Sequence, residues 1–282
     1  MKIGKYNIHS LVSGGFKLDG GAMFGIIPKP LWNKSNPADQ LNRISLVTRN
    51  LLLVSGSRKI LIDTGIGEKW NDKAKEIYEL DFTKFSLEHS LRALGVESSD
   101  ITDVLLTHLH FDHTGGSTRL ENGKLIPAFP NAKYFVAKKN YEWGINATDR
   151  DKGSYLKENF QPLFENGVLH FFDENENLFD DEIELVRVNG HTMGQQLFKI
   201  SDTTNALLYC GDLFPTGSHI PLPYIMGYDL QPLVTLSEKK KLLPLAVEEN
   251  WKLVFEHDPF YAAATVAKNE KGFSVHQKFE AL

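Results

Sequence analysis

Apolar residues in this chain gather in short runs separated by polar turns, and most runs have the length of a β-strand. Residues 43–54 and 59–62 form two such runs joined by Ser55-Gly56-Ser57, which predicts a strand–turn–strand unit. The run 103–107 has the look of a buried strand and leads directly into His108. Five further runs predict strands: residues 133–137, 182–188, 195–200, 206–210 and 252–255.

Helical patterns are fewer. Residues 85–94 predict a helix, and residues 138–145 have helix-like spacing. Residues 237–251 predict a longer helix with Ser237 as its cap and Pro244 as the site of a kink or break. Strands and helices both occur throughout the chain, with strands in the majority. This order predicts a mixed α/β protein whose sheets are covered by helices.

The 282 residues contain no low-complexity tract and no internal repeat, which suits a single domain over residues 1–282. Two segments are harder to place. We expect an N-terminal loop at residues 10–42 and an insertion at about residues 115–182. Long excursions of this kind often cover an active site.

Composition excludes several classes of protein. Hydrophobic residues make up 41% and charged residues 24%, which is ordinary for a globular chain and excludes a disordered or coiled-coil one. The single cysteine, Cys210, excludes an internal disulfide. No apolar run is long enough for a membrane span, and the first residues lack the apolar core of a signal peptide, so we expect a cytoplasmic location. The net charge of −5 argues against non-specific nucleic-acid binding.

The segment Thr107-His108-Leu109-His110-Phe111-Asp112-His113-Thr114-Gly115-Gly116 carries the chemistry. In an extended chain His108 and His110 point to the same side and can bind one metal ion. A bend after Phe111 turns Asp112 and His113 towards a second ion, and the two glycines permit it. Imidazole and carboxylate ligands suit zinc, and also iron, manganese or cobalt.

Three further ligand-type residues stand where predicted strands end. His191 follows the strand 182–188, Asp212 follows the strand 206–210, and His257 follows the strand 252–255. Each lies beside a glycine or a turn, which is the position of many catalytic side chains. The shared context predicts that they complete the metal site.

Taken in order, these motifs resemble the metallo-β-lactamase superfamily over about residues 44–257. The resemblance implies a four-layer αββα sandwich with the metal ions at one edge. It assigns His108, His110 and His191 to one ion, Asp112, His113 and His257 to the other, and Asp212 to a bridging position. Asp63, in the turn Asp63-Thr64-Gly65, resembles a group that orients a ligand histidine, and Thr107 or Thr192 could serve similarly.

The implied chemistry is hydrolysis assisted by two divalent ions, most simply zinc. Two ions can share a water molecule and lower its pKa enough to give a bridging hydroxide. Asp112 is expected to orient this water and to protonate the leaving group. No Ser-His-Asp triad and no glycine-rich phosphate loop accompanies these residues.

Within the superfamily the chain is most similar to N-acyl-homoserine lactonases and to lactonase-like and organophosphate-hydrolase-like enzymes. The string 108–116, the string Gly190-His191-Thr192-Met193-Gly194-Gln195 and the N-terminal stretch 18–32 carry this likeness. The best-known lactonases have a tyrosine three residues after the bridging aspartate, where this chain has Pro215. An aryl ester or organophosphate substrate is the alternative.

The expected substrate is a small lactone or ester held in an apolar pocket. Candidate pocket residues are Met23, Phe24, Trp32, Phe111, Phe214, His219, Tyr224 and Ile225. Most large apolar residues are simply buried in a core, which is the competing interpretation of the apolar members. Tyr224 and His219 are the candidates to replace the tyrosine absent at position 215.

Other functions share parts of the motif. A glutathione thioesterase carries a helical domain after the last ligand, and only a short stretch follows His257. Flavodiiron proteins have a glutamate in place of His110, and an iron-dependent persulfide dioxygenase binds a single metal ion, which the second set Asp112, His113 and His257 speaks against. A binding module without metal would have lost ligands. By resemblance alone we expect a homodimer.

Overall fold

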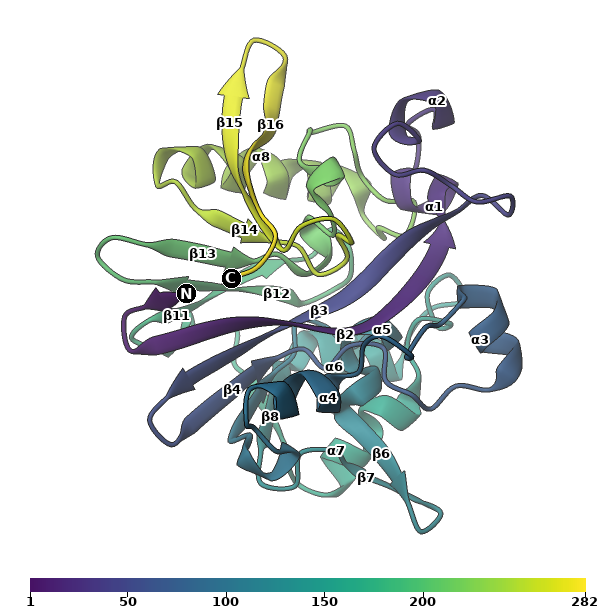
Figure 1. The fold of residues 1–282 in the computed structure, drawn as a ribbon, viewed down its shortest axis with the longest axis vertical. Coiled ribbons are helices and arrows are strands. Elements are labelled where there is room, and N and C mark those ends of the chain that lie inside the picture. Colours follow the sequence, from purple (N-terminus) through teal and green to yellow (C-terminus); the bar gives the residue numbers. More distant parts are fainter. The chain divides into compact units, whose positions relative to one another are not determined.

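The computed structural model describes residues 1–282 and divides into two compact units (Figure 1). Unit 1 comprises Met1–Gly15 and Thr48–Glu176, and unit 2 comprises Phe16–Val47 and Asn177–Leu282. The chain passes between the units inside two long strands, β2 (Tyr6–Asp19) and β3 (Arg43–Ser55), and again after Glu176. The predicted single domain stays a prediction.

The sheet of unit 1 has seven strands in the order β1-β2-β3-β4-β5-β8-β9. β3 and β4 form an antiparallel hairpin, and β4, β5, β8 and β9 run parallel. Their bounds are Lys2–Ile3 for β1, Arg58–Ile62 for β4, Asp103–Leu105 for β5, Lys133–Ala137 for β8 and Leu169–Phe172 for β9. Residues from the continuous apolar runs, such as Leu52, Leu61 and Val104, are fully buried in the core of unit 1.

Five short helices and one hairpin complete unit 1. The helices are α3 (Asp72–Tyr78), α4 (Leu87–Ala93), α5 (Phe111–Thr114), α6 (Lys138–Ile145) and α7 (Gln161–Glu165), and the hairpin joins β6 (Thr118–Glu121) to β7 (Lys124–Pro127). The hydroxyl of Ser86 accepts a hydrogen bond from the amide of His89 and caps α4. Gly95, at φ 70°, ends that helix, which confirms the helix predicted for residues 85–94.

The sheet of unit 2 has seven strands in sequence order, β10 to β16. They are Leu178–Asp180, Ile183–Val188, Gln195–Ser201, Ala206–Tyr209, Lys252–Val254, Ala263–Asn269 and Gly272–Phe279. All neighbours are antiparallel except β13 and β14, which are parallel and connected through the long helix α8 (Pro232–Glu248). Two short helices, α1 (Gly20–Phe24) and α2 (Lys29–Trp32), also belong to this unit.

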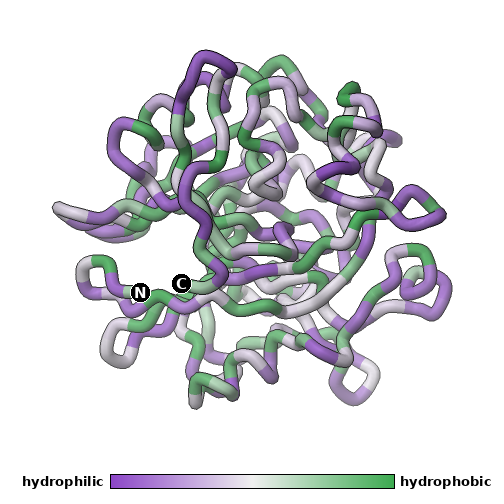
Figure 2. The backbone as a smooth tube through the Cα atoms, turned by 45° about the horizontal axis from the view of Figure 1, so that its top comes forward, coloured by the Kyte–Doolittle hydropathy of each residue, from purple (hydrophilic) through white to green (hydrophobic).

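The predicted mixed α/β class with two large sheets is confirmed. Figure 2 shows hydrophilic residues at many of the outer loops, and the buried hydrophobic residues lie largely on the strands. No helix is long and apolar enough to cross a membrane.

Four expectations are wrong in detail. Residues 10–19 of the expected loop 10–42 belong to β2, which was missed because Gly14 and Gly15 interrupt its strand-like pattern. The predicted helix 237–251 begins at Pro232, whose fixed φ suits a first helical turn, so Ser237 lies inside it and is not a cap. Pro244 lies within the same helix and does not break it. The segment 115–182 supplies β8 and β9 to the sheet of unit 1.

Candidate functional site

The histidine motif lies just after β5 in unit 1. His108 and His110 lie between β5 and α5, His110 with an extended backbone, and Nε2 of His108 is 3.1 Å from Nδ1 of His110. The chain then turns into α5, the single helical turn that carries Asp112 and His113. All four side chains are buried. The predicted bend therefore occurs, one residue earlier than Phe111.

Asp63 holds this motif from the end of β4. Its carboxylate accepts hydrogen bonds from the amide and the hydroxyl of Thr107 at 2.7 and 2.6 Å, and it is 3.2 Å from Nδ1 of His113. A carboxylate only accepts, so Nδ1 of His113 carries the proton. The hydroxyl of Thr107 in turn accepts from Nδ1 of His108 at 3.1 Å. Both rings therefore keep the lone pair of Nε2 for a metal ion.

Gly115 and Gly116 are required by close packing against the turn that follows Asp63. A Cβ atom on Gly115 would collide with the backbone carbonyl of Ile66, and one on Gly116 would collide with the carbonyl of Thr64. The amide and hydroxyl of Thr64 donate to the carbonyl of His113 at 2.8 and 3.1 Å. The two predicted turns, 63–65 and 113–116, thus form one rigid assembly.

In unit 2 the structure brings together the three residues that follow strands. His191 lies in the loop between β11 and β12, Asp212 in the 3-10 turn Gly211–Leu213, and His257 just after β14. Nε2 of His191 is 3.2 Å from Oδ2 of Asp212, and Nε2 of His257 is 3.1 Å from Oδ1. All three are almost completely buried.

The Nδ1 atoms of His191 and His257 show which protonation state the two rings have. Nδ1 of His191 is 2.9 Å from the carboxylate of Asp229, and Nδ1 of His257 is 2.9 Å from the carbonyl of Val47. Both partners only accept hydrogen bonds, so each Nδ1 carries its proton and each Nε2 presents a lone pair to an oxygen of Asp212. Facing acceptors in a buried site require positive charge between them. A divalent cation supplies that charge, so this donor set fits a metal ion.

Helix α8 supports the His191 loop. The hydroxyl of Thr235 donates to Asp229 at 2.8 Å, and the carboxylate of Glu238 accepts from the amides of Asn189 and Gly190 at 2.6 and 3.2 Å. Burial raises the pKa of Glu238 above its ordinary value. Sequence reasoning missed Asp229 and Glu238. An acid directly before a helix is the available signal for Asp229, but its pairing with His191 follows only from the fold.

Most candidate pocket residues pack together in unit 2. The ring of Phe24 stacks on those of Trp32 and His219, at centroid distances of 5.3 and 4.8 Å, and meets the edge of Tyr224 at 6.1 Å. Met23, Phe24, Trp32 and Phe214 are buried within the unit, whereas Tyr224 and Ile225 are partly exposed.

His219 is fully engaged inside unit 2. Its Nε2 donates to the carbonyl of Met23 at 2.8 Å, and its Nδ1 accepts from the hydroxyl of Thr216 at 2.8 Å. Burial lowers the pKa of His219 to about 4, so the ring is neutral near pH 7. Neither ring nitrogen is left to bind a substrate carbonyl, which rules out His219 as a substitute for the tyrosine absent at position 215.

Phe111 lies in unit 1, in an aromatic cluster that the sequence did not reveal. Its ring is 5.3 Å from those of both Trp70 and Tyr78. Burial, and secondarily the charge of Asp112, raise the pKa of Tyr78. The phenol therefore stays protonated near Asp112.

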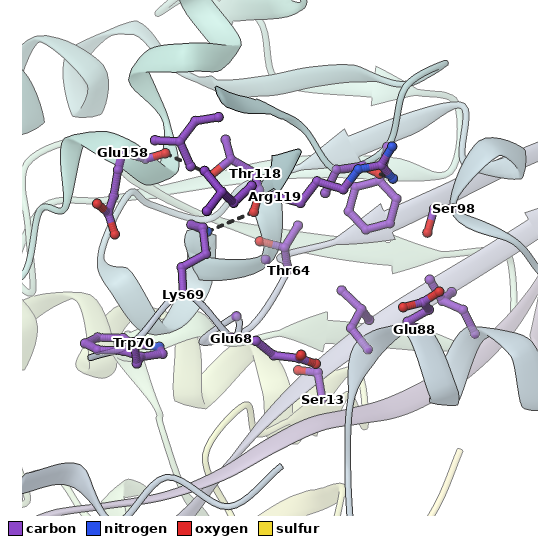
Figure 3. A pocket seen from close by; sticks show the side chains of 18 of the residues that line it. Ser13, Thr64, Glu68, Lys69, Trp70, Glu88, Ser98, Thr118, Arg119 and Glu158 are labelled. Carbon is purple, nitrogen blue, oxygen red and sulfur yellow. Dashed lines mark hydrogen bonds between the residues drawn. The ribbon is translucent and has the colours of Figure 1, made fainter. Parts of the chain in front are cut away.

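Trp70 also lines a cavity of about 730 Å³ within unit 1 (Figure 3). Thr64 and Gly116, the backs of the two turns described above, line it as well. Lys69 donates to the carbonyls of Gly115 and Thr118, and burial lowers its pKa to about 8.

Buried histidine and aspartate clusters at strand ends, in a mixed α/β chain with two large sheets, define a metal-binding protein. The chain belongs to the metallo-β-lactamase superfamily, which matches residues 46–257.

Curated relatives are similar over part of the chain. N-acyl homoserine lactonase AttM of Azorhizobium caulinodans is 28% identical over 173 residues, 60% of this chain and 62% of that protein. The N-acyl homoserine lactonase of Bacillus thuringiensis is 28% identical over 171 residues, 60% of each chain. The chain thus matches less than two thirds of the length of these relatives.

Solved structures match nearly the whole chain. A probable metal-dependent hydrolase from Staphylococcus aureus has a TM-score of 0.89 and 30% identity, and the match covers 99% of this chain and 98% of that one. AidC, a dizinc quorum-quenching lactonase, has a TM-score of 0.81 at 23% identity over 98% of this chain and 96% of that one, and shows the same fold.

Proposed function

We propose that this protein is a dinuclear metal-dependent hydrolase that opens lactones, most simply N-acyl-homoserine lactones. The arrangement at Asp212, whose two carboxylate oxygens face Nε2 of His191 and of His257, carries the proposal. The lactonase names of the curated relatives support the choice of substrate.

The proposed ligand sets are those that the likeness to the superfamily implies. His108, His110 and His191 would hold one ion, Asp112, His113 and His257 the other, and Asp212 would bridge them. The protonated Nδ1 atoms of His108, His113, His191 and His257 support this assignment, because each leaves Nε2 as the ligand atom. Zinc suits this set of imidazole and carboxylate ligands best, and iron, manganese or cobalt would also be bound.

When bound, two divalent ions would activate water and polarise the ester carbonyl. The residues supply the rest. Asp63 and Thr107 fix the rings of His108 and His113, so their ligand atoms need no reorganisation. Asp112 would orient the attacking water, take a proton from it, and pass that proton to the leaving alkoxide. Phe111, with Trp70 and Tyr78 against it, offers an apolar wall beside that carboxylate.

An aryl ester or organophosphate is the second candidate substrate. Pro215 favours it, since the tyrosine that assists the lactone carbonyl in the best-known lactonases is absent and His219 does not replace it. We also propose that the chain forms a homodimer, which light scattering of the purified chain would test. We propose a cytoplasmic location for it.

The test is proton release by the zinc-loaded protein. The substrates are acyl-homoserine lactones of short and long chain, simple γ- and δ-lactones, and an aryl phosphotriester. Lactone opening by the wild type, lost in Asp212→Asn and kept in the exposed control Asp181→Asn, is expected. If the wild type binds two metal ions and releases no protons with any lactone, the lactonase proposal is overturned. Hydrolysis of the phosphotriester alone would establish the second candidate.

A further inference from the structure

Lys239, on α8, has no exposed surface, although lysine is among the residues least often fully buried. Its ammonium donates to three backbone carbonyls, those of His219 at 2.6 Å, Pro221 at 2.9 Å and Tyr224 at 2.8 Å. An ammonium has three N–H groups. All three N–H groups therefore donate to a single turn of the chain, residues 219–224.

Burying an ammonium is costly, and a methionine of similar length would fill the same space without that cost. Its other neighbours offer little compensation: the Phe214 ring lies 5.7 Å from Nζ, and the carboxylate of Asp229 favours the charged form only from a distance. The hydrogen bonds to the three carbonyls are thus the main interactions of the buried ammonium. The carbonyl of His219 stands at the end of the 3-10 helix Gly217–His219, where helical carbonyls lose their partners, and those of Pro221 and Tyr224 follow in irregular chain.

The turn held by Lys239 ends the segment that begins just after Asp212. At the near end of that segment, the carbonyl of Pro215 accepts from the amide of His257 at 2.9 Å, and Asp258 accepts from the amide of Gly217 at 3.0 Å. At the far end, Lys239 fixes the turn. Residues 215–224 are therefore tied at both ends within unit 2.

His219 passes this constraint to the N-terminal part of the unit. Its Nε2 donates to the carbonyl of Met23, and its ring stacks on Phe24 with the planes 6° apart. The amide of Gly227 donates to the carbonyl of Ala22 at 2.8 Å and adds a second tie. The position of α1 thus depends on the turn that Lys239 holds.

We propose that Lys239 is a positioning residue that sets residues 217–227 and, through His219, helix α1, and that it thereby positions the candidate substrate-pocket residues Met23 and Phe24. The role in substrate binding rests on the proposed lactonase function. The role of Lys239 in fixing residues 217–227 does not depend on that function. Lys239 touches none of the metal ligands, so its removal affects substrate binding and leaves metal content and the chemical step nearly intact.

The experiment compares Lys239→Met, which removes the donors, with Lys239→Gln, which keeps an N–H donor, and with the exposed control Lys240→Met. Amide hydrogen exchange of the zinc-loaded proteins is measured first. Lys239→Met is expected to lose about tenfold protection at residues 217–227 and 20–25, the equivalent of one lost hydrogen bond, with the sheet strands unchanged. Lys239→Gln should fall between it and the wild type.

Lactone kinetics and zinc content are then measured on the same samples. In Lys239→Met, KM should rise about tenfold with kcat within about threefold, and two zinc ions should remain. Unchanged exchange at residues 217–227 in a folded Lys239→Met, or in Lys239→Gln should the first variant not fold, would overturn the proposal. A fall in kcat alone, with KM unchanged, would overturn its role in substrate binding. If Lys239→Met shows the expected change in exchange but the wild type opens no lactone, the lactonase function is wrong and the positioning role of Lys239 still holds.

Discussion

The carboxylate of Asp229 accepts a hydrogen bond from Nδ1 of His191 at 2.9 Å, and its second oxygen accepts from the hydroxyl of Thr235 at 2.8 Å. Helix α8 thereby fixes both the tautomer and the direction of a candidate metal ligand 38 residues away in the chain. His191 is 2% exposed, so no solvent competes for this contact.

Asp229→Asn should weaken zinc binding without unfolding the protein. The amide can donate to Nδ1 and favour the wrong tautomer, so the zinc dissociation constant is expected to rise about 10- to 100-fold. Competition with a chromophoric chelator measures it, and Asp181→Asn, an exposed carboxylate of unit 2, is the matched control. Equal zinc affinity in Asp229→Asn and wild type would show that Asp229 does not orient a ligand.

Asp63→Asn should cost stability even in the absence of metal. Asp63 is completely buried and accepts from Thr107 twice, and an amide in its place would turn a donor towards one of these groups or towards His113. Chemical denaturation of the metal-free protein is expected to show a loss of about 3 kcal/mol. A loss under about 0.5 kcal/mol, the range of an ordinary surface change, would contradict this.

Gly115→Ala should destabilise unit 1, because the new methyl group would collide with the backbone carbonyl of Ile66 and the backbone cannot move aside cheaply. The expected loss is roughly 1–3 kcal/mol. Gly153→Ala is the control, since a methyl group there meets nothing within 4 Å and needs no unusual φ. Thermal unfolding of the two variants side by side measures the difference, and equal midpoints would contradict the packing described.

The stability of unit 2 should fall in acid because of His219. Burial lowers the pKa of His219 to about 4, from 6.5 in an unfolded chain. Between these values the unfolded chain binds the proton and the folded chain does not. The contribution is therefore fully present above about pH 6.5 and is lost as the pH falls towards 4. At pH 5 the loss is about 2 kcal/mol.

Urea unfolding of the metal-free wild type and His219→Gln measures this effect. The advantage of the wild type should shrink by about 2 kcal/mol between pH 7.5 and pH 5. A constant difference between the two proteins over this range would show that His219 does not titrate with a lowered pKa.

Local pattern was enough to predict eight of the sixteen strands and to single out the candidate ligand motif His108–His113. Apolar runs such as β8 and β14 are short and bounded by polar turns, and His108 to His113 are close in sequence. The same logic failed at β2, where Gly14 and Gly15 break the apolar pattern. Gly14 is there because Ile66 and Thr48 lie within 3.2 Å of any Cβ at that position, a tertiary cause invisible to a local pattern.

The supporting residues could not be predicted for a related reason. Asp229, Glu238 and Lys239 contact groups 15 to 49 residues away in sequence. Asp229 looks like an ordinary acid before a helix, and Glu238 and Lys239 look like ordinary charged residues within it. Trp70 and Tyr78 likewise reach Phe111 only because α3 folds back onto α5. The candidate ligands could be found from motif order, whereas the groups that orient them required the fold.

The most direct test of the account is the number of metal ions bound per chain. Zinc-loaded wild-type protein, freed of excess metal and measured by plasma mass spectrometry with amino-acid analysis, should hold two ions. Asp212→Asn, which removes the proposed bridging carboxylate, should hold fewer, while Asp181→Asn should hold two. A wild type with no bound metal, or an Asp212→Asn variant that keeps two ions, would contradict a dinuclear centre built on His191, Asp212 and His257.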